Sequence, residues 1–314
     1  RMDFITVAYF SRNVGWVENP GDSSKSWTYH EIDLPGTSEA AALVDLTGDG
    51  TPDVLPNPTN VVAWYQLEQA GPSPKWRKFD FGTEAAGHGV GSGDVNGDGR
   101  VDLLTPKGWF ESPARPTEDK WAWHPEWQVG ATGIQMLARD VDGDGLADVV
   151  FGMGHDYGLF WLKQSRDPEG KRSWTKQTID DKLAQAHALV WTDLNGDGKD
   201  DELLTGKRVY AHEIEPGATD ASQIAYYRYD RSAKSWTKHV IFQGEPAKSA
   251  PADREKRNAQ VDFPAGTAGT GLQLHPVDID KDGDIDIVCG GKSGLYYFEN
   301  LGSTAGKAAA GNQN

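Results

Sequence analysis

Short apolar runs recur along the chain, and each is followed by an acidic loop and then by a second apolar run. Residues 41–44 and 189–191 are examples of the first run, and residues 149–151 and 287–289 are examples of the second. Runs of this length bounded by Gly and Asp are typical of β-strands, because helices need longer periodic segments. The pattern therefore predicts a chain of short strands.

A strand that begins with Gly or Ala and an aromatic residue comes next, and a polar turn leads to a strand that begins with Trp. The third strand of the unit is predicted at residues 15–16, 63–65, 108–110, 158–161 and 294–297, and the fourth at residues 27–30, 76–78, 174–176 and 236–238. One unit thus comprises four strands in roughly 48 residues. Four antiparallel strands in a repeat of this length are typical of a β-propeller blade. We interpret the Trp residues as packing between blades.

The acidic loop occurs five times, at residues 45–53, 94–102, 140–148, 193–201 and 278–286. Oxygen-bearing side chains at loop positions 1, 3, 5 and 9 suit Ca²⁺, which takes about six to eight oxygen ligands in a flexible geometry. Glycines at positions 4 and 6 permit the sharp bend of the backbone. Thr47 at position 3 and Lys281 in place of Gly predict weaker binding in the first and fifth loops. The predicted ligands are Asp45, Asp49, Asp53, Asp94, Asn96, Asp98, Asp102, Asp140, Asp142, Asp144, Asp148, Asp193, Asn195, Asp197, Asp201, Asp278, Asp280, Asp282 and Asp286.

The two ends of the chain hold incomplete units. Residues 1–6 match residues 100–105, the end of a loop and the strand after it, so we expect the chain to begin inside a repeat and upstream sequence to be missing. Six partial or complete units are visible in a single domain over residues 1–302. We predict seven blades, with six as the alternative. Residues 303–314 have low complexity and are predicted to be disordered.

Unit five differs from the others because it carries two insertions, around residues 213–222 and 242–270. The longer insertion is rich in Pro, Ala, Lys and Glu and shows no strand pattern. It is interpreted as a functional or a flexible loop.

The net charge of −16 argues against nucleic acid and an anionic membrane surface as partners. Up to five Ca²⁺ ions would offset much of this charge, so calcium is expected to stabilise the fold. The single cysteine, Cys289, excludes an internal disulfide framework and is expected in the core. No apolar run is long enough to span a bilayer. Because calcium loops of modest affinity suit compartments rich in Ca²⁺, we predict an extracytoplasmic location, secreted or periplasmic.

The loops Asp94-Val-Asn96-Gly-Asp98-Gly and Asp140-Val-Asp142-Gly-Asp144-Gly, in repeats of blade length, resemble those of FG-GAP/VCBS repeat proteins. The resemblance covers nearly the whole chain and implies a Ca²⁺-studded β-propeller, as in the integrin α-subunit head and many bacterial extracellular proteins. It does not choose a function, since such propellers adhere, bind or catalyse. The propeller of aldos-2-ulose dehydratase, which eliminates water from keto-sugars, is an enzymatic relative that the chain resembles, but no catalytic residue is carried over from it.

Blade topology separates the acidic loops from a second set of polar residues. If the first strand of a blade ends at the acidic loop, the second strand returns to the opposite face. The residues at that face, taken from the start of the first strand, the end of the second strand and the insertion, are Glu39, His88, His187, Gln135, Gln273, Lys107, His155, Asp156, Tyr157, Lys207, Arg208, Lys292 and His212. Since the first strand is innermost, we expect these side chains to meet at the mouth of the central channel.

Two chemistries suit this cluster, and both are β-elimination on a sugar derivative. His88, His155 and His187 would hold Zn²⁺ or a similar ion that polarises a carbonyl, while Tyr157 or a histidine removes the α-proton. Alternatively, lysine and arginine side chains neutralise a carboxylate or enolate, and a histidine acts as base. The catalytic set is then His88, His155, His187, Tyr157, Lys107, Lys207 and Arg208, with Glu39, Gln135, Gln273, Lys292, Asp156 and His212 as substrate contacts.

We favour an extracytoplasmic enzyme that acts on a carbohydrate or keto-sugar derivative as a lyase or dehydratase. Hydrolysis by a carboxylate pair stays open, because Glu39 and Asp156 share this face. The alternative is a non-catalytic propeller that binds glycan or protein through the same face. Wet channel mouths also collect polar residues without any function.

Overall fold

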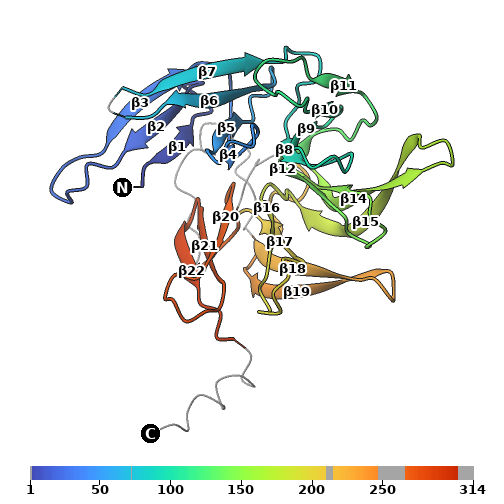
Figure 1. Cartoon of the computed structure of the whole chain (residues 1–314). Coiled ribbons are helices and arrows are strands. Elements are labelled where there is room, and N and C mark those ends of the chain that lie inside the picture. The colour runs from blue at the N-terminus through green and yellow to red at the C-terminus, as the bar shows by residue number, and fades with distance from the viewer. Residues whose placement is uncertain (1, 72, 210–214, 247–265, 303–314) are drawn as a thin grey trace, which may run out of the picture. The chain divides into compact units, whose positions relative to one another are not determined.

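The computed structural model describes residues 2–71, 73–209, 215–246 and 266–302. Every regular element in these residues is a β-strand, so the all-β prediction is confirmed (Figure 1). Contacts divide the chain into two compact units, Arg1–Phe151 with Phe160–Thr178, and Gly152–Leu159 with Ile179–Asn314. The described residues contain no helix with the length and apolar character needed to cross a membrane. The predicted tail and most of the longer insertion lie outside the described residues.

The strands follow the predicted order of the repeat. The first sheet contains β1 (Phe4–Val7), β2 (Val14–Glu18) and β3 (Thr28–Asp33), and the second contains β4 (Ala41–Val44), β5 (Asp53–Pro56), β6 (Ala63–Gln69) and β7 (Lys75–Asp80). The eight-stranded sheet contains, in spatial order, β11 (Ala122–His124), β10 (Gly108–Glu111), β9 (Asp102–Thr105), β8 (Val90–Gly93), β12 (Thr132–Arg139), β13 (Asp148–Met153), β14 (Tyr157–Arg166) and β15 (Arg172–Ala184). The last two sheets contain β16 (Leu189–Thr192), β17 (Glu202–Lys207), β18 (Gln223–Asp230) and β19 (Ser235–Gln243), and then β20 (Leu274–Val277), β21 (Asp286–Gly291) and β22 (Gly294–Phe298).

Four-stranded antiparallel groups of this kind are the blades of a β-propeller. In the sheet of β16–β19, for example, Leu189 lies opposite Thr205, and Leu204 lies opposite Tyr226. The first sheet lacks a first strand and the last sheet lacks a fourth strand within the described residues, as the sequence predicts. The number of blades stays a prediction.

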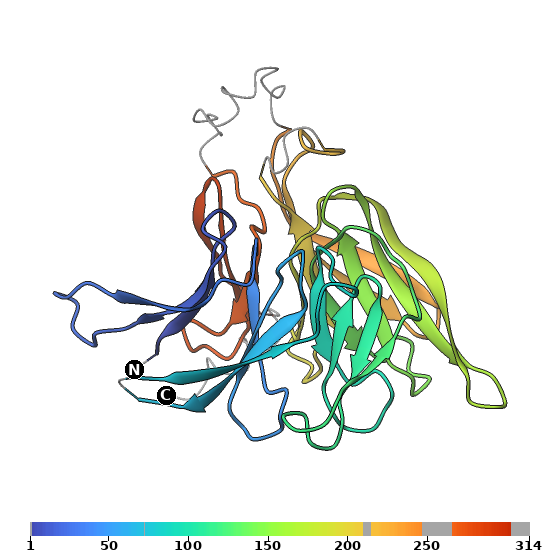
Figure 2. The ribbon, with the colours of Figure 1, turned by 90° about the horizontal axis from the view of Figure 1, so that it is seen from above.

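The eight-stranded sheet arises because the first strands of two blades pair with each other, which the sequence does not predict. β8 and β12 run parallel, with Val90 opposite Gln135 (Figure 1). A Cβ on Gly91 would lie 1.8 Å from the Met136 carbonyl oxygen, so only glycine permits this approach. β14 and β15 extend from this sheet as a long hairpin (Figure 2).

Tryptophan and phenylalanine side chains fill the core of the first unit. Trp64 is fully buried and stacks on Phe79 with ring centroids 4.0 Å apart. The same cluster contains Phe110 and Trp121 from the next blade, which confirms that Trp residues pack between blades in this unit. In the second unit, Cys289 is fully buried among apolar side chains, as expected.

A buried carboxylate closes each of the five acidic loops, and in four of them it is the Asp at loop position 9. Asp102 accepts the backbone N–H of Val95 at 2.9 Å and that of Ser112 at 2.8 Å, so it ties the start of the loop to the end of β10. In three other loops the backbone N–H of the second loop residue donates to the last Asp in the same way. These hydrogen bonds join Leu46 to Asp53 (3.0 Å), Val141 to Asp148 (3.2 Å) and Ile279 to Asp286 (3.1 Å). Because a buried carboxylate must be hydrogen-bonded, these contacts fix where the second strand begins.

The fourth loop differs from the prediction, because Glu202 rather than Asp201 takes this position. Glu202 is fully buried and accepts the N–H of Leu194 at 3.1 Å. The loop is one residue longer than the others, and the longer side chain of glutamate reaches the same donor. The run Glu202-Leu-Leu-Thr205 matches Asp102-Leu-Leu-Thr105, and this match is the sequence signal for the shift.

Burial raises the pKa of Asp53 to about 6 and that of Asp102 and Asp148 to about 7, and neighbouring loop carboxylates act in the same direction. Asp286 differs, because the N–H of Asn300 holds the pKa of that carboxyl below its ordinary value. We expect the melting temperature in EDTA to fall between about pH 4 and 7, since a carboxyl with a raised folded-state pKa stabilises the fold only while it can stay protonated. A group with a lowered pKa loses its contribution only below about pH 4.

Thermal unfolding in EDTA between about pH 4 and 7 checks whether the melting temperature falls as the pH rises. Each kcal/mol lost should lower the melting temperature by about 2–4 °C for a chain of this size. Asp102→Asn should reduce the slope, because the side chain no longer titrates. A melting temperature that rises with pH in EDTA would contradict the expectation.

Candidate functional site

The first Asp of each acidic loop accepts backbone N–H groups from the loop itself. Asp45 accepts from Gly48 at 2.7 Å, from Asp49 at 3.2 Å and from Gly50 at 2.8 Å, and Asp94 and Asp193 repeat the arrangement. The glycines adopt positive φ, and Lys281 takes the same conformation with φ of 66° in the fifth loop. The bend is therefore preserved where the glycine is replaced.

The oxygens of these loops fit calcium. Carboxylate oxygens of Asp140, Asp142 and Asp148 lie within 4.8 Å of one another, as do those of Asp278, Asp280 and Asp282. Oδ1 of Asp142 and Oδ1 of Asp278 are buried and have no hydrogen-bond partner among the described residues. Buried carboxylate oxygens without a donor need a cation, so the donor set suits a hard divalent ion.

Basic side chains also reach three of the loops. Lys163 on β14 contacts Asp142 and lies 2.8 Å from Asp144, and Arg228 lies 3.2 Å from Asp197. Arg100 pairs with Asp98 within its own loop. These cations offset part of the acidic charge and would compete with Ca²⁺ for the same oxygens.

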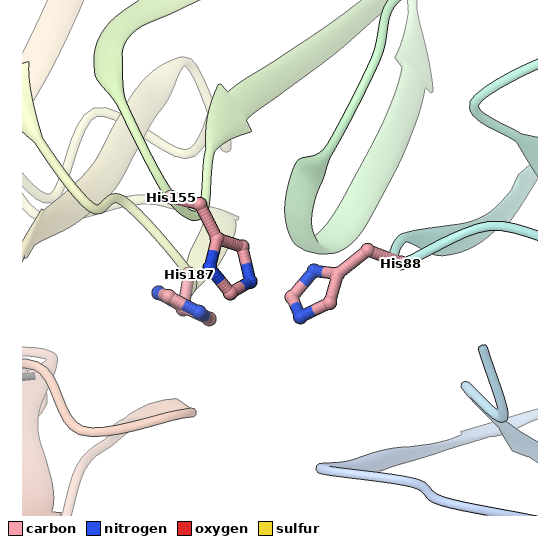
Figure 3. A group of neighbouring side chains, drawn as sticks. All are labelled: His88, His155 and His187. Carbon is pink, nitrogen blue, oxygen red and sulfur yellow. The ribbon is translucent and has the colours of Figure 1, made fainter. Parts of the chain in front are cut away.

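Three histidines meet at the edge of the eight-stranded sheet opposite its acidic loops (Figure 3). His88 precedes β8, His155 lies between β13 and β14, and His187 follows β15. One ring nitrogen of each histidine lies within 4.8 Å of a ring nitrogen of the other two. The ring centroids of His155 and His187 are 5.9 Å apart. The structure therefore brings together the three residues that the sequence proposed as ligands.

Backbone carbonyls orient two of these rings. Nδ1 of His88 lies 2.7 Å from the Thr132 oxygen, and Nδ1 of His187 lies 3.0 Å from the Gln185 oxygen. Because a carbonyl oxygen can only accept, each Nδ1 carries a proton, and in the neutral form of the ring Nε2 then carries the lone pair. Gly89 permits the first of these contacts, since a Cβ there would lie 2.0 Å from Thr132 Oγ1.

Glu39 is the carboxylate of this group. Its Oε1 lies 3.8 Å from Nε2 of His88, and both side chains are largely buried. Asn57, which the sequence analysis missed, fixes this pair, because its Oδ1 accepts the N–H of Glu39 at 2.9 Å and its Nδ2 donates to the His88 oxygen at 3.2 Å. No local pattern marks Asn57, since its partners lie in different segments.

Two amides add acceptor atoms near the histidines. Gln135, a predicted substrate contact, lies opposite Val90, and its Oε1 is buried without a hydrogen-bond partner in the described residues. Gln185 is close in sequence to His187, and its Oε1 is also buried without a hydrogen-bond partner in the described residues. Such oxygens can accept hydroxyl groups of a ligand.

Tyr157 and Lys207 have partners that change their predicted roles. The Tyr157 hydroxyl donates to Asp220 at 2.7 Å, and this hydrogen bond raises the pKa of Tyr157, so the side chain is poorly suited to remove a proton. Burial lowers the pKa of Lys207 to about 8. Its Nζ donates to the Arg208 oxygen at 3.1 Å, which indicates a structural role.

The other predicted residues belong to several different elements. Lys107 donates to the Glu84 oxygen at 2.9 Å, and the Asp156 oxygen accepts the N–H of Gln185. Arg208 is half-buried after β17. Gln273 and Lys292 belong to the sheet of β20–β22, and His212 lies outside the described residues.

Comparison with solved structures finds a lectin of Agrocybe aegerita, described in work on its specific recognition of non-reducing terminal N-acetylglucosamine. The two chains share 13% identity over 97% of this chain and 82% of the lectin, with a TM-score of 0.44. A likeness at this level identifies neither ligand nor activity for the present chain. The comparison with curated proteins finds no match.

The FG-GAP-like repeat family matches residues 140–204, which contain two acidic loops and the strands between them. The predicted resemblance is thus confirmed at the level of the repeat: the chain carries FG-GAP-like repeats in an all-β fold of propeller blades.

Proposed function

We propose that this chain is a calcium-stabilised, extracytoplasmic β-propeller whose three histidines bind a second divalent cation, such as Zn²⁺, and act with it on a carbohydrate derivative by β-elimination. The convergence of nitrogens from His88, His155 and His187 within 4.8 Å carries the proposal. Three histidines with an open position form a common catalytic zinc set.

The surroundings of the histidines support a metal site. Nδ1–H of His88 and of His187 donates to a backbone carbonyl, which fixes the ring and directs the Nε2 lone pair to a ligand. His187 is fully buried, so its imidazole needs such a partner. This arrangement is the usual outer support of a metal-binding histidine.

A cation at this site would polarise a carbonyl oxygen of the substrate. Glu39 is then better placed than Tyr157 to take the α-proton, because its carboxylate borders His88 whereas the Tyr157 hydroxyl is held by Asp220. The electron pair of the broken C–H bond forms the C=C bond, and the β C–O bond breaks. The departing hydroxide takes up the proton that Glu39 removed, so the substrate loses one water and the Glu39 carboxylate is restored. Oε1 of Gln135 would accept a sugar hydroxyl.

One observation favours a non-catalytic, glycan-binding propeller as the second candidate. Lys107 and Lys207, which would neutralise developing negative charge, donate to backbone carbonyls instead. A site that binds hydroxyl groups needs no such charges. In this case the same histidines and amides would hold the sugar without breaking a bond.

Metal analysis tests the centre. After dialysis against Zn²⁺ or Co²⁺ with Ca²⁺ present, the protein should retain about one transition-metal ion beyond its calcium, because three histidines suit such an ion. His187→Ala and His88→Ala should lose it. His239→Ala is the matched control, since His239 stacks on Tyr226 on β18 and belongs to the outer strand β19. Equal transition-metal content in all variants would refute the centre.

Turnover of keto-sugar derivatives tests the reaction. Loss of one water by mass spectrometry and appearance of an unsaturated carbonyl by absorbance are expected for the wild type. Glu39→Gln should lower kcat by about 100-fold or more, because the base is lost, while metal content is kept. Glu118→Gln, at an exposed ion pair with Arg115, is the control. Sugar binding by the wild type with no product would favour the non-catalytic candidate instead.

A further inference from the structure

Gln185 has a backbone conformation that is uncommon for its residue type. It directly follows β15, is fully buried and has φ of 53°, in the left-handed region that favours glycine. Strained conformations of this kind persist only where the surroundings fix them, and they gather at functional sites.

Three hydrogen bonds fix the residue in place. Its N–H donates to the Asp156 oxygen at 2.9 Å, and its Nε2 donates to the Pro216 oxygen at 3.2 Å. Its own carbonyl accepts Nδ1–H of His187 at 3.0 Å. Gln185 is thus bonded to the residue after His155 and to His187 itself.

A glycine allows the side-chain anchor to form. Gly217 follows Pro216 and has φ of 74°. A Cβ on Gly217 would lie 2.2 Å from Cβ of Ala184 and 3.2 Å from Cζ of Tyr157. Only glycine lets this segment approach the end of β15 closely enough for the Pro216 carbonyl to accept from Gln185.

We propose that Gln185 is the positioning residue of the histidine centre, an inference that rests on the proposed metal site. With its side chain anchored and its backbone left-handed, the Gln185 carbonyl holds the proton of His187 on Nδ1 and leaves Nε2 to the metal. The same residue keeps the loop of His155 in register through Asp156. Gln185 touches neither metal nor substrate in this role.

Two variants distinguish the effect of the hydrogen bond from the Gln185 side chain to the Pro216 oxygen from the effect of the strained backbone. Gln185→Gly relieves the strain and removes the anchor, and Gln185→Glu keeps the size but cannot donate to the Pro216 oxygen. The matched control is Lys234→Gly, which relieves the same strain, φ of 52°, in the exposed turn between β18 and β19. Co²⁺ titration followed by visible absorption should show about 10- to 100-fold weaker binding in both Gln185 variants and unchanged binding in the control.

The tautomer of His187 in the metal-free protein provides a second readout, by long-range ¹H–¹⁵N correlation of the imidazole. The wild type and Lys234→Gly should show the proton on Nδ1, whereas Gln185→Glu should show a mixture of tautomers. Wild-type Co²⁺ affinity together with a wild-type tautomer in Gln185→Glu would overturn the positioning role. A wild type that binds no Co²⁺ would overturn the metal centre instead, and the tautomer would still decide whether Gln185 orients His187. If Gln185→Gly does not fold, Gln185→Glu decides alone.

Discussion

A buried carboxylate that accepts backbone N–H groups at the end of the acidic loop is the interaction on which each repeat depends. Asp102 bonds to Val95 and Ser112, and Asp148 bonds to Val141 and Gln164. Burying a charged oxygen without donors is costly, so the first, second and third strands must meet at this point. The raised pKa of these groups shows that burial opposes their ionisation, and a divalent cation beside them would favour it.

This constraint acts at one end of the strands and leaves the other end to different chemistry. At that end of the eight-stranded sheet, Nδ1 of His88 and Nδ1 of His187 each donate to a backbone carbonyl. Imidazole nitrogens suit a transition metal, whereas the oxygen atoms of the acidic loops suit calcium. The acidic loops and the histidines thus lie at opposite ends of the strands and offer different donor atoms, oxygen in the loops and nitrogen in the histidine group.

The hydrogen-bond partners of the basic and phenolic groups reduce the number of residues that could act in the proposed elimination. Lys207 supports a backbone segment, and Tyr157 donates to Asp220, so neither is available in the role that its residue type suggests. In the proposed elimination the candidate base is Glu39, whose Oε1 lies 3.8 Å from Nε2 of His88. A chemical role in a site depends on the neighbours of a side chain as much as on its type.

The sequence by itself determined the strands, the acidic loops and the three histidines, because strand patterns, turn residues and equivalent positions in a repeat are local properties. It also placed the histidines at the end opposite the loops. Only the tertiary structure decided the parallel pairing of β8 with β12 and the orientation of the imidazoles. The Thr132 carbonyl that orients His88 is 44 residues away in the chain, and Asn57 acts from 31 residues away. Such contacts join segments that are far apart in the sequence, and a local sequence pattern does not show which distant segments will meet.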